Sequence, residues 1–309
     1  MTPPLRIGLV GIGKIARDQH VPAIAGIPGL TLAAAASRHG RVEGVANYPD
    51  LEAMLAGEPG LDAVALCQPP QVRYLAAKTA LAAGKHVFLE KPPGVTVSEV
   101  DALAALASNQ GVTLFASWHS RYAAAVGQAR DWIAANGARR ISINWKEDVR
   151  HWHPGQAWIW QPGGFGVFDP GINALSILTE IVSEPIRVIE ARLDTPANRA
   201  APIAASLRLE TTGGTQIEAE FDWRQTGPQT WDIAVEADAG ELLLSLGGNA
   251  MAIDGRLQPA RPEREYPAMY QHFLELVRSG RSDVDSRPLR LVAAAFLCGR
   301  YCSTESFED

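Results

Sequence analysis

The stretch GLVGIGKIA, residues 8–16, leads from an apolar strand pattern through two glycines into a helical pattern. Gly11, Gly13 and Ala16 match the form G-x-G-x-x-A, in which small or missing side chains let the backbone approach a pyrophosphate at a helix N-terminus. Glycine-rich turns also occur for purely geometric reasons, but the position directly after LRIGLV and before a helix favours dinucleotide binding. We therefore expect the cofactor to contact Gly11, Ile12, Gly13, Lys14 and Ile15.

Strand and helix patterns alternate through the first third of the chain. Apolar runs suited to buried parallel strands lie at residues 5–10, 30–36, 62–67, 86–90 and 112–117. Helical patterns separate them at residues 14–26, 50–57, 72–84 and 97–110. This repeated alternation predicts a doubly wound α/β sheet, so we assign residues 1–120 to a dinucleotide-binding domain.

The pattern changes after about residue 120. One helical pattern, a long loop and a second helical pattern precede alternating strands at residues 205–212, 215–223 and 230–237. These features predict an α/β domain with an open, mainly antiparallel sheet and helices on one face. All eight tryptophans lie between Trp118 and Trp231, which suggests that residues 121–309 form a substrate-binding domain. The C-terminal helix could pack back on the first domain.

Composition and charge restrict the class of protein. Of the 309 residues 47% are hydrophobic and 20% are charged, as in globular proteins, and the net charge of -6 gives no basic footprint for nucleic acid. No apolar run reaches the roughly 20 residues that span a bilayer, and MTPPLRIGLV lacks the layout of a signal peptide. We expect a cytoplasmic protein that binds neither nucleic acid nor membranes. Cys67, Cys298 and Cys302 are expected to be core thiols, the last two in one helix.

The end of the second predicted strand indicates which dinucleotide binds. Ser37, Arg38 and His39 occupy the place where an NAD-specific protein often has an acid that holds the ribose 2′-hydroxyl. A hydroxyl and a guanidinium there suit a 2′-phosphate, so we expect NADP to be preferred over NAD. The alternative is a solvated basic loop.

The stretch HVFLEKPPGV, residues 86–95, ends an apolar strand with an acid, a base and two prolines. Ligands bind beyond the carboxyl ends of the strands in an open parallel sheet, and Lys91 directly follows such an end. The prolines stiffen the exit and aim Lys91 at the nicotinamide region, where an amine can hold a substrate hydroxyl and help to move its proton. The alternative is a surface lysine in a proline-rich turn.

Four motifs together resemble a known family. GIGKIARDQHVPAI, CQPP, EKP and GGFGVFDPGINAL fall in the order and spacing of the glucose-fructose oxidoreductase / inositol dehydrogenase family. The resemblance implies an N-terminal Rossmann domain, a C-terminal α/β domain with an open antiparallel sheet, and NAD(P)-dependent sugar oxidation. Within the family the chain is similar to the bacterial aldose 1-dehydrogenases that act on L-arabinose and D-galactose. The resemblance also implies cofactor contacts at Cys67, Gln68, Pro69, Glu90 and Lys91.

The chain departs from this family on the substrate-domain helix. Where the family commonly has D-x-x-x-H, this chain has Asp169 and Asn173, four residues apart and so on one helix face. A neutral amide cannot accept the proton, so Asn173 is expected to orient hydroxyls and Asp169 to act as the base, paired with Lys91. The alternative for Asp169, next to Pro170, is a helix N-cap.

Two further departures concern the first domain. The frequent histidine after the third strand corresponds to Arg73, and the usual asparagine after the fifth strand corresponds to His119. His119 and Trp231 are candidate walls of the substrate pocket, and their alternative role is packing.

The segment NWKEDVRHWHPGQAWIWQPGGFG, residues 144–166, holds four of the eight tryptophans. Flat aromatic faces such as Trp152 pack against sugar C–H faces, while Glu147 and His153 can bind hydroxyls. A tryptophan cluster is more often plain core, but the density of glycine and proline favours a loop over a site. His151 and His153 would share a strand face; because no cysteine or third histidine lies at ligand spacing, we expect no metal.

Together these features predict an oxidoreductase that moves hydride from C1 of a cyclic aldose to NADP+ and gives an aldonolactone. Two alternatives remain open: oxidation of a ring secondary alcohol, as in inositol dehydrogenation, and a non-catalytic NADP-binding regulator. The expected partner is a small-molecule aldose, and the open sheet could pair two copies in a homodimer.

The cofactor interpretation predicts a selective loss in Arg38→Ala. A guanidinium that binds the 2′-phosphate should contribute about 1.5–3 kcal/mol to NADP binding, as a charge-assisted hydrogen bond does, and little to NAD binding. Titration of the protein with each reduced cofactor measures both affinities. Equal losses for the two cofactors would contradict the assignment.

Overall fold

The computed structural model describes residues 3–259 and 262–308. The chain divides into two compact units. Unit 1 runs to His119 and takes up the chain again over Tyr266–Ser286, whereas unit 2 comprises Ser120–Glu265 and the chain from Arg287 onward. The sequence suggested a single boundary after residue 120; in the structure, residues 266–286 belong to unit 1 because their apolar side chains complete its core.

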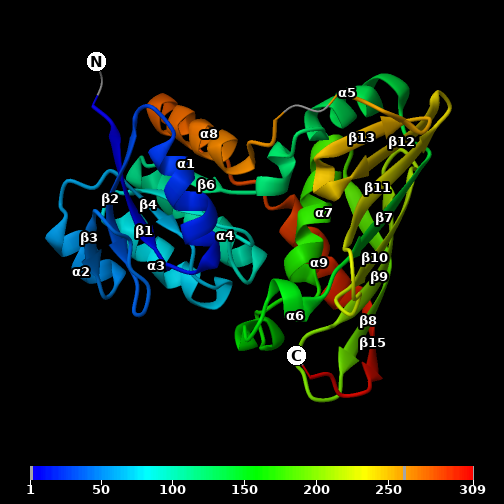
Figure 1. Cartoon of the computed structure of the whole chain (residues 1–309), viewed down its shortest axis with the longest axis horizontal. Helices are drawn as coiled ribbons and strands as arrows, with labels where there is room; N and C mark the ends of the chain where they lie inside the picture. The colour runs from blue at the N-terminus through cyan, green and yellow to red at the C-terminus, as the bar shows by residue number, and fades with distance from the viewer. Residues whose placement is uncertain (1–2, 260–261, 309) are drawn as a thin grey trace. The chain divides into compact units, whose positions relative to one another are not determined.

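Unit 1 is built on a parallel sheet that has six strands within the described residues, in the order β3-β2-β1-β4-β5-β6 (Figure 1). The strands are β1 (Leu5–Val10), β2 (Leu30–Ala36), β3 (Ala46–Tyr48), β4 (Ala63–Leu66), β5 (His86–Leu89) and β6 (Leu114–Ala116). The helical segments are a π-helical turn (Ala16–His20) continued by α1 (Val21–Ala25), then α2 (Leu51–Gly57), α3 (Pro70–Ala82) and α4 (Val97–Gln110). The doubly wound fold is confirmed, with β3 as a strand that the sequence pattern missed.

Local sequence signals set the ends of the helices in unit 1. The Asp50 side chain accepts a hydrogen bond from the Ala53 N–H and begins α2. At α4, Thr96 and Glu99 form a reciprocal capping box, and Gly111 ends the helix with a positive φ of 65°. These caps define where α2 and α4 begin and where α4 ends, and short segments then lead from each helix to the next strand.

Helix α8 (Glu265–Ser279) completes the core of unit 1 although it comes late in the sequence. Phe88 on β5 stacks on Tyr270 with ring centroids 4.7 Å apart and meets Phe273 edge-on at 5.6 Å. Phe115 on β6 also stacks on Phe273. Aromatic pairs of this kind stabilise a fold by more than their buried area accounts for, and here they hold α8 against the sheet.

Unit 2 contains a mixed sheet of nine strands among its described residues, in the order β14-β13-β12-β11-β7-β10-β9-β8-β15. The strands are β7 (Arg140–Lys146), β8 (Ile186–Pro196), β9 (Ala204–Thr211), β10 (Gln216–Asp222), β11 (Thr230–Ala237), β12 (Gly240–Ser245), β13 (Ala250–Ile253), β14 (Arg256–Leu257) and β15 (Gly299–Thr304). The pairs β7–β10 and β8–β15 are parallel and the others antiparallel, so the expected mainly antiparallel sheet is confirmed.

Helices α5 (Val126–Asn136), α7 (Phe168–Ile181) and α9 (Arg287–Cys298) lie on one face of this sheet (Figure 1). Every residue of α7 is buried except Asn173 and Glu180. Gly171 allows the close approach of α7 to β10, since a Cβ there would lie 2.9 Å from the Phe221 ring. The opposite face of β10 carries exposed Glu218 and Glu220, so this side of the sheet is polar.

Two expectations about unit 2 are wrong. Residues 144–166 do not form one loop with His151 on a strand: β7 ends at Lys146, α6 (Val149–Trp152) follows, and a 3-10 turn covers Ala157–Trp160. The cause is Asp148, whose carboxylate accepts from the Arg150 N–H and begins a helical turn.

The second correction concerns the cysteines. Helix α9 ends at Cys298, which is exposed, and Cys302 lies half-buried on β15. The two residues therefore do not share a helix, and Cys298 is no core thiol. Cys67 is half-buried after β4. No helix in the described part of the chain has the length and apolar character needed to cross a membrane.

Candidate functional site

The turn after β1 has the geometry that a pyrophosphate needs. Gly11 adopts a φ of 88°, and its N–H donates to the Ala36 carbonyl at 2.9 Å. A Cβ on Gly11 would lie 2.9 Å from the Gln68 nitrogen, so only a glycine lets the exit of β4 come this close. A Cβ on Gly13 would meet no atom within 4 Å, which leaves the backbone there accessible. The turn thus fits the dinucleotide expected from the sequence.

The loop after β2 packs directly on this turn. The Ser37 hydroxyl accepts from the Gly40 N–H at 3.1 Å, and a Cβ on Gly40 would lie 2.3 Å from the Ile12 carbonyl oxygen. Arg38 between them is exposed. A close contact between the two loops therefore fixes the place at which Arg38 leaves the sheet.

The remaining predicted cofactor contacts lie at the same edge of the sheet. Ile12 is buried, whereas Lys14 and Ile15 are exposed, and Lys14 forms an ion pair with Asp18 one turn later. Cys67 donates its N–H to the Val10 carbonyl at 2.8 Å, which ties the exit of β4 to β1. Gln68 follows it, and Pro69 is the N-cap residue of α3.

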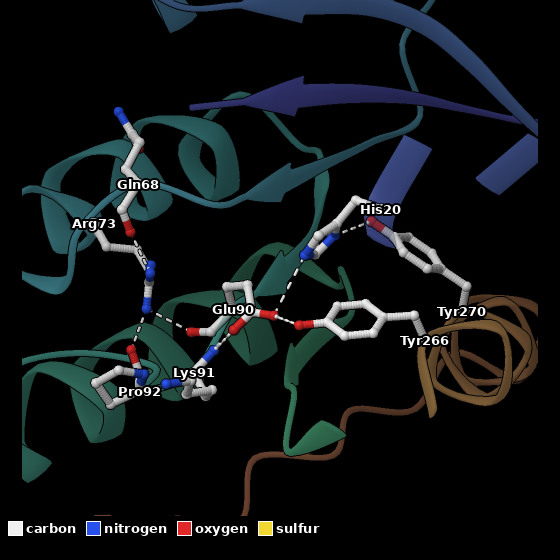
Figure 2. Close-up of polar contacts among 8 residues, drawn as sticks. All are labelled: His20, Gln68, Arg73, Glu90, Lys91, Pro92, Tyr266 and Tyr270. Carbon is white, nitrogen blue, oxygen red and sulfur yellow. Dashed lines mark hydrogen bonds and ion pairs between the residues drawn. The ribbon is translucent and has the colours of Figure 1, made fainter. Parts of the chain in front are cut away.

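Glu90 and Lys91 leave β5 at this edge too, and Figure 2 shows the contacts around them. Glu90 is buried, and its carboxylate accepts from the Tyr266 hydroxyl at 2.7 Å, from His20 at 3.3 Å and from the Lys91 N–H. Burial raises the pKa of Glu90, but the His20 hydrogen bond and the nearby charges of His20, His119 and Lys91 together lower that pKa to about 2. Glu90 is therefore ionised at neutral pH. The Lys91–Pro92 peptide bond is cis.

Arg73 fixes the backbone on the other side of Lys91. Its buried guanidinium donates to the carbonyl oxygens of Gln68, Glu90 and Pro92 (Figure 2). The sequence marked Arg73 only as a departure from the family, and no local pattern indicated that an arginine here would bind three carbonyl groups.

His119 lies at the last position of the first segment of unit 1. Its ring stacks on Tyr266, with centroids 5.6 Å apart and an interplanar angle of 17°. Tyr266 and His20 both contact the Glu90 carboxylate, and neither was singled out from the sequence as a functional residue. His20 stands in the motif GIGKIARDQHVPAI, which was the one available signal.

In unit 2, the end of β7 brings a buried carboxylate to a pair of indoles. Glu147 accepts from the Trp231 Nε1 at 2.9 Å and from the Trp223 Nε1 at 3.2 Å. Trp231 on β11 stacks on its cross-strand partner Trp145, and Trp152 lies against Trp231 with ring centroids 5.1 Å apart. Trp152 is exposed, so this group of rings reaches the surface as well as the core.

His153 connects Glu147 to the helix α7. Its Nε2 lies 3.9 Å from the Glu147 Oε1 and 3.6 Å from the Asp169 Oδ2. Both carboxylates are buried, which is costly unless cations or donors are close. The structure thus brings together Glu147, His153, Asp169, Trp152 and Trp231, all predicted from the sequence.

Asp169 does not cap its helix. Val167 is the N-cap residue of α7 and makes no side-chain hydrogen bond, while Asp169 lies inside the first turn. Asn173 follows one turn later and is half-buried on an otherwise buried helix. Its amide can donate to and accept from a sugar hydroxyl, the role expected from the sequence.

The carboxylates and indoles gathered in unit 2 are suited to hydrogen bonding with hydroxyls. Across residues 3–259 and 262–308 there is no group of three or more histidine, cysteine, aspartate or glutamate residues that could hold a metal ion. Paired carboxylates beside indole rings are, in contrast, suited to a sugar, because carboxylates accept from hydroxyls and indoles cover C–H faces.

Comparison with known proteins identifies the family. Residues 5–117 match an oxidoreductase family with an NAD-binding Rossmann fold. The chain is 46% identical over 306 residues to the galactose 1-dehydrogenase of Pseudomonas fluorescens, which covers 99% of each sequence. The chain belongs to this oxidoreductase family. The resemblance stated from the four sequence motifs is thereby confirmed, and the protein is an oxidoreductase with an NAD(P)-binding domain.

Solved structures agree with this assignment. The D-galactose-1-dehydrogenase from Rhizobium etli has a TM-score of 0.96 at 56% identity, over 100% of this chain and 99% of that one. A 3-ketoreductase from Actinomadura kijaniata, solved with NADP and TDP-benzene, has a TM-score of 0.86 at 20% identity, over 97% and 99% of the two chains. The second likeness shows the shared fold.

The contact between Gly40 and Ile12 predicts that Gly40→Ala weakens dinucleotide binding. The added methyl group would displace the Ile12 carbonyl and with it the turn that faces the pyrophosphate, and overpacking of this kind costs about 1–3 kcal/mol. We expect the dissociation constant for the reduced cofactor to rise about tenfold. In the control Gly60→Ala the new methyl group is 3.8 Å from its nearest neighbour, the Arg6 side chain. Unchanged affinity in Gly40→Ala would show that the turn tolerates displacement.

Proposed function

We propose that the protein is an NAD(P)+-dependent aldose 1-dehydrogenase that oxidises C1 of L-arabinose and D-galactose to the aldonolactone. The observation that carries the proposal is the cluster of Glu147, His153 and Asp169 beside an indole wall, in a chain that is 46% identical over its length to a galactose 1-dehydrogenase. The carboxylates of this cluster supply hydrogen-bond acceptors and the indoles supply an aromatic surface, and together they suit a single sugar ring.

Binding of the sugar is assigned to unit 2 and to His119. Glu147, His153 and Asn173 would hold ring hydroxyls, because carboxylate, imidazole and amide groups together accept and donate. Trp152 and Trp231 would cover the apolar C–H face of the ring. Glu147 is already held by two indole N–H groups, so its carboxylate has a fixed orientation and recognition of a hydroxyl needs little reorganisation.

The chemistry removes a hydride from C1 and a proton from the C1 hydroxyl, and forms the C1=O bond of the lactone. The bound nicotinamide would supply the hydride acceptor. Asp169 would take the hydroxyl proton, and the Lys91 ammonium would hold the same oxygen as its O–H bond breaks. Asn173 positions the sugar and takes no proton.

The cofactor preferred in this proposal is NADP, with NAD as the weaker alternative. Ser37 and the exposed Arg38 support it, because they offer a hydroxyl and a guanidinium at the end of β2, where an acid would repel a 2′-phosphate. The cofactor contacts assigned from the sequence, Gly11 to Ile15, Cys67 to Pro69, and Glu90 with Lys91, belong to the same proposal.

Oxidation of a ring secondary alcohol and a regulator that binds NADP without turnover are the alternative functions. A panel of sugars and inositols with each cofactor separates all three, because a regulator gives no turnover and an inositol-type enzyme prefers the polyol. The cytoplasmic location and the homodimer through the polar open sheet stay predictions.

Two substitutions test the assignment of the proton transfer. Lys91→Ala and Asp169→Ala should each lower kcat by about a hundredfold or more, the usual scale for a positioned acid or base, with cofactor affinity largely intact. Asn173→Ala should raise KM for the sugar at least as much as it lowers kcat, because its role is positioning. Steady-state kinetics and cofactor titration measure these effects. Lys78→Ala, at an exposed lysine of α3, is the control, and a Lys91→Ala variant with near wild-type kcat would remove the mechanism.

The substrate assignment predicts an order of activity among five sugars. L-Arabinose, D-galactose and D-fucose share the hydroxyl arrangement at C2, C3 and C4 and differ only in the group on C5, which usually changes specificity by about 10- to 200-fold. D-Glucose and D-xylose have an inverted C4 hydroxyl that leaves buried polar groups unpaired, so their kcat/KM should be much lower. Comparison of kcat/KM decides the point. A preference for D-glucose or myo-inositol over L-arabinose would overturn the assignment.

A further inference from the structure

The backbone on both sides of Lys91 is held by side chains from unit 1. The carbonyl oxygens of Glu90 and Pro92 accept from the Arg73 guanidinium, and the Lys91 N–H donates to the Glu90 Oε2 (Figure 2). Three backbone groups within residues 90–92 are thus fixed by two buried side chains of opposite charge. A surface lysine in a turn needs no such arrangement.

The protonation states in this cluster follow from the ionised Glu90. A carboxylate can only accept, so the Tyr266 hydroxyl and the His20 Nε2 must both donate to its Oε1. The other ring nitrogen of His20, Nδ1, lies 2.7 Å from the Tyr270 hydroxyl. Burial raises the pKa of Tyr270 well above its usual value, so this hydroxyl keeps its proton and can donate.

The cluster draws its members from distant parts of the sequence. His20 ends the π-helical turn after β1, Glu90 follows β5, and Tyr266 and Tyr270 come from α8. All four are buried, with exposed fractions of 0%, 3%, 5% and 0% respectively. An apolar cluster of the same shape would hold α8 at no cost in desolvated charge, so stability alone does not account for a buried carboxylate here.

We propose that Glu90 is a positioning residue: its carboxylate, held by His20 and Tyr266, fixes the Lys91 peptide and thereby holds the Lys91 amine in its reactive orientation. The proposal rests on the role of Lys91 given above and assigns to the Glu90 side chain a task other than the cofactor contact expected from the sequence. Tyr266 and His20 act through Glu90 and touch no reactant.

Even a small displacement of the Lys91 amine is expected to lower the rate. A displacement of about 1 Å in a reacting group can lower the rate about a hundredfold, although binding of the substrate changes little. Loss of the Glu90 charge should therefore appear in kcat, with the KM values for sugar and cofactor nearly unchanged.

Tyr266→Phe and Glu90→Gln are the test variants. Tyr266→Phe keeps the ring that stacks on His119 and removes one donor to Glu90, so we expect kcat to fall about tenfold; Glu90→Gln puts an amide N–H where an oxygen accepted, and should lower kcat about a hundredfold. Both KM values should stay within about twofold of wild type. Tyr48→Phe is the matched control, because it removes a tyrosine hydroxyl that donates to Glu58 elsewhere in unit 1.

A double-mutant cycle distinguishes positioning from a structural role. If Glu90 acts through Lys91, adding Glu90→Gln to Lys91→Ala should lower kcat less than about threefold further, because the group being positioned is already gone. Full multiplication of the two losses, or a lower melting temperature with wild-type kcat, would assign the cluster to stability and overturn the proposal.

Amide hydrogen exchange gives a readout that needs no substrate. In Tyr266→Phe the Lys91 amide should exchange at least about tenfold faster, while the Val87 amide inside β5, which donates to the Thr113 carbonyl, keeps its rate. Unchanged exchange at Lys91 overturns the proposal. If the wild-type protein oxidises no aldose, the proposed function fails, and this measurement still decides whether the cluster holds Lys91.

Discussion

All strands of the first sheet run in the same direction, and this constraint decides where the chemistry of unit 1 can lie. Parallel strands release the chain at one edge, so the segments after β1, β4 and β5 meet although they are far apart in the sequence. Gly11 has no side chain because the exit of β4 passes within contact distance of it. Glu90 and Lys91 leave the sheet at the same edge, and Arg73 binds carbonyl groups from two of these exits. The sheet therefore brings the predicted cofactor contacts to one edge.

The periodic parts of the chain were predictable and the isolated ones were not. Helix α4 and strand β11 have the bounds expected from the sequence, since fourteen residues of helical period or eight of alternation leave little ambiguity. Strand β3 has three residues and no fully buried one, so it left no apolar run. Helix α6 depends on one capping aspartate, which a strand pattern in the same stretch concealed. The packing of helix α8 on the first sheet depends on contacts across the fold, which no local pattern indicates.

The residues of the candidate site likewise divide into those that could be predicted from the sequence and those that could not. Gly11, Lys91, Glu147, His153 and Asp169 were predicted because each stands in a motif or beside an unusual cluster of residue types. His20 and Tyr266 were missed because their roles depend on a contact with Glu90 made across the fold. A contact of that kind has no local pattern in either segment. In unit 2, the indole donors to Glu147 likewise come from β11 and from the residue after β10, and only the sheet register brings them together.

The path of the chain has a consequence for how the protein is made. The polypeptide leaves unit 1 after His119 and supplies Tyr266, Tyr270 and Phe273 to its core only after the first segment of unit 2, Ser120–Glu265, has passed. During synthesis from the N-terminus, Phe88 and Glu90 must therefore wait for the greater part of the chain to emerge before their aromatic partners arrive. Until then the Phe88 ring and the Glu90 carboxylate lack the contacts that α8 makes with them in the finished protein. Unit 1 cannot be completed before the greater part of unit 2 has been translated, and a fragment that stops at residue 119 would end with that core incomplete.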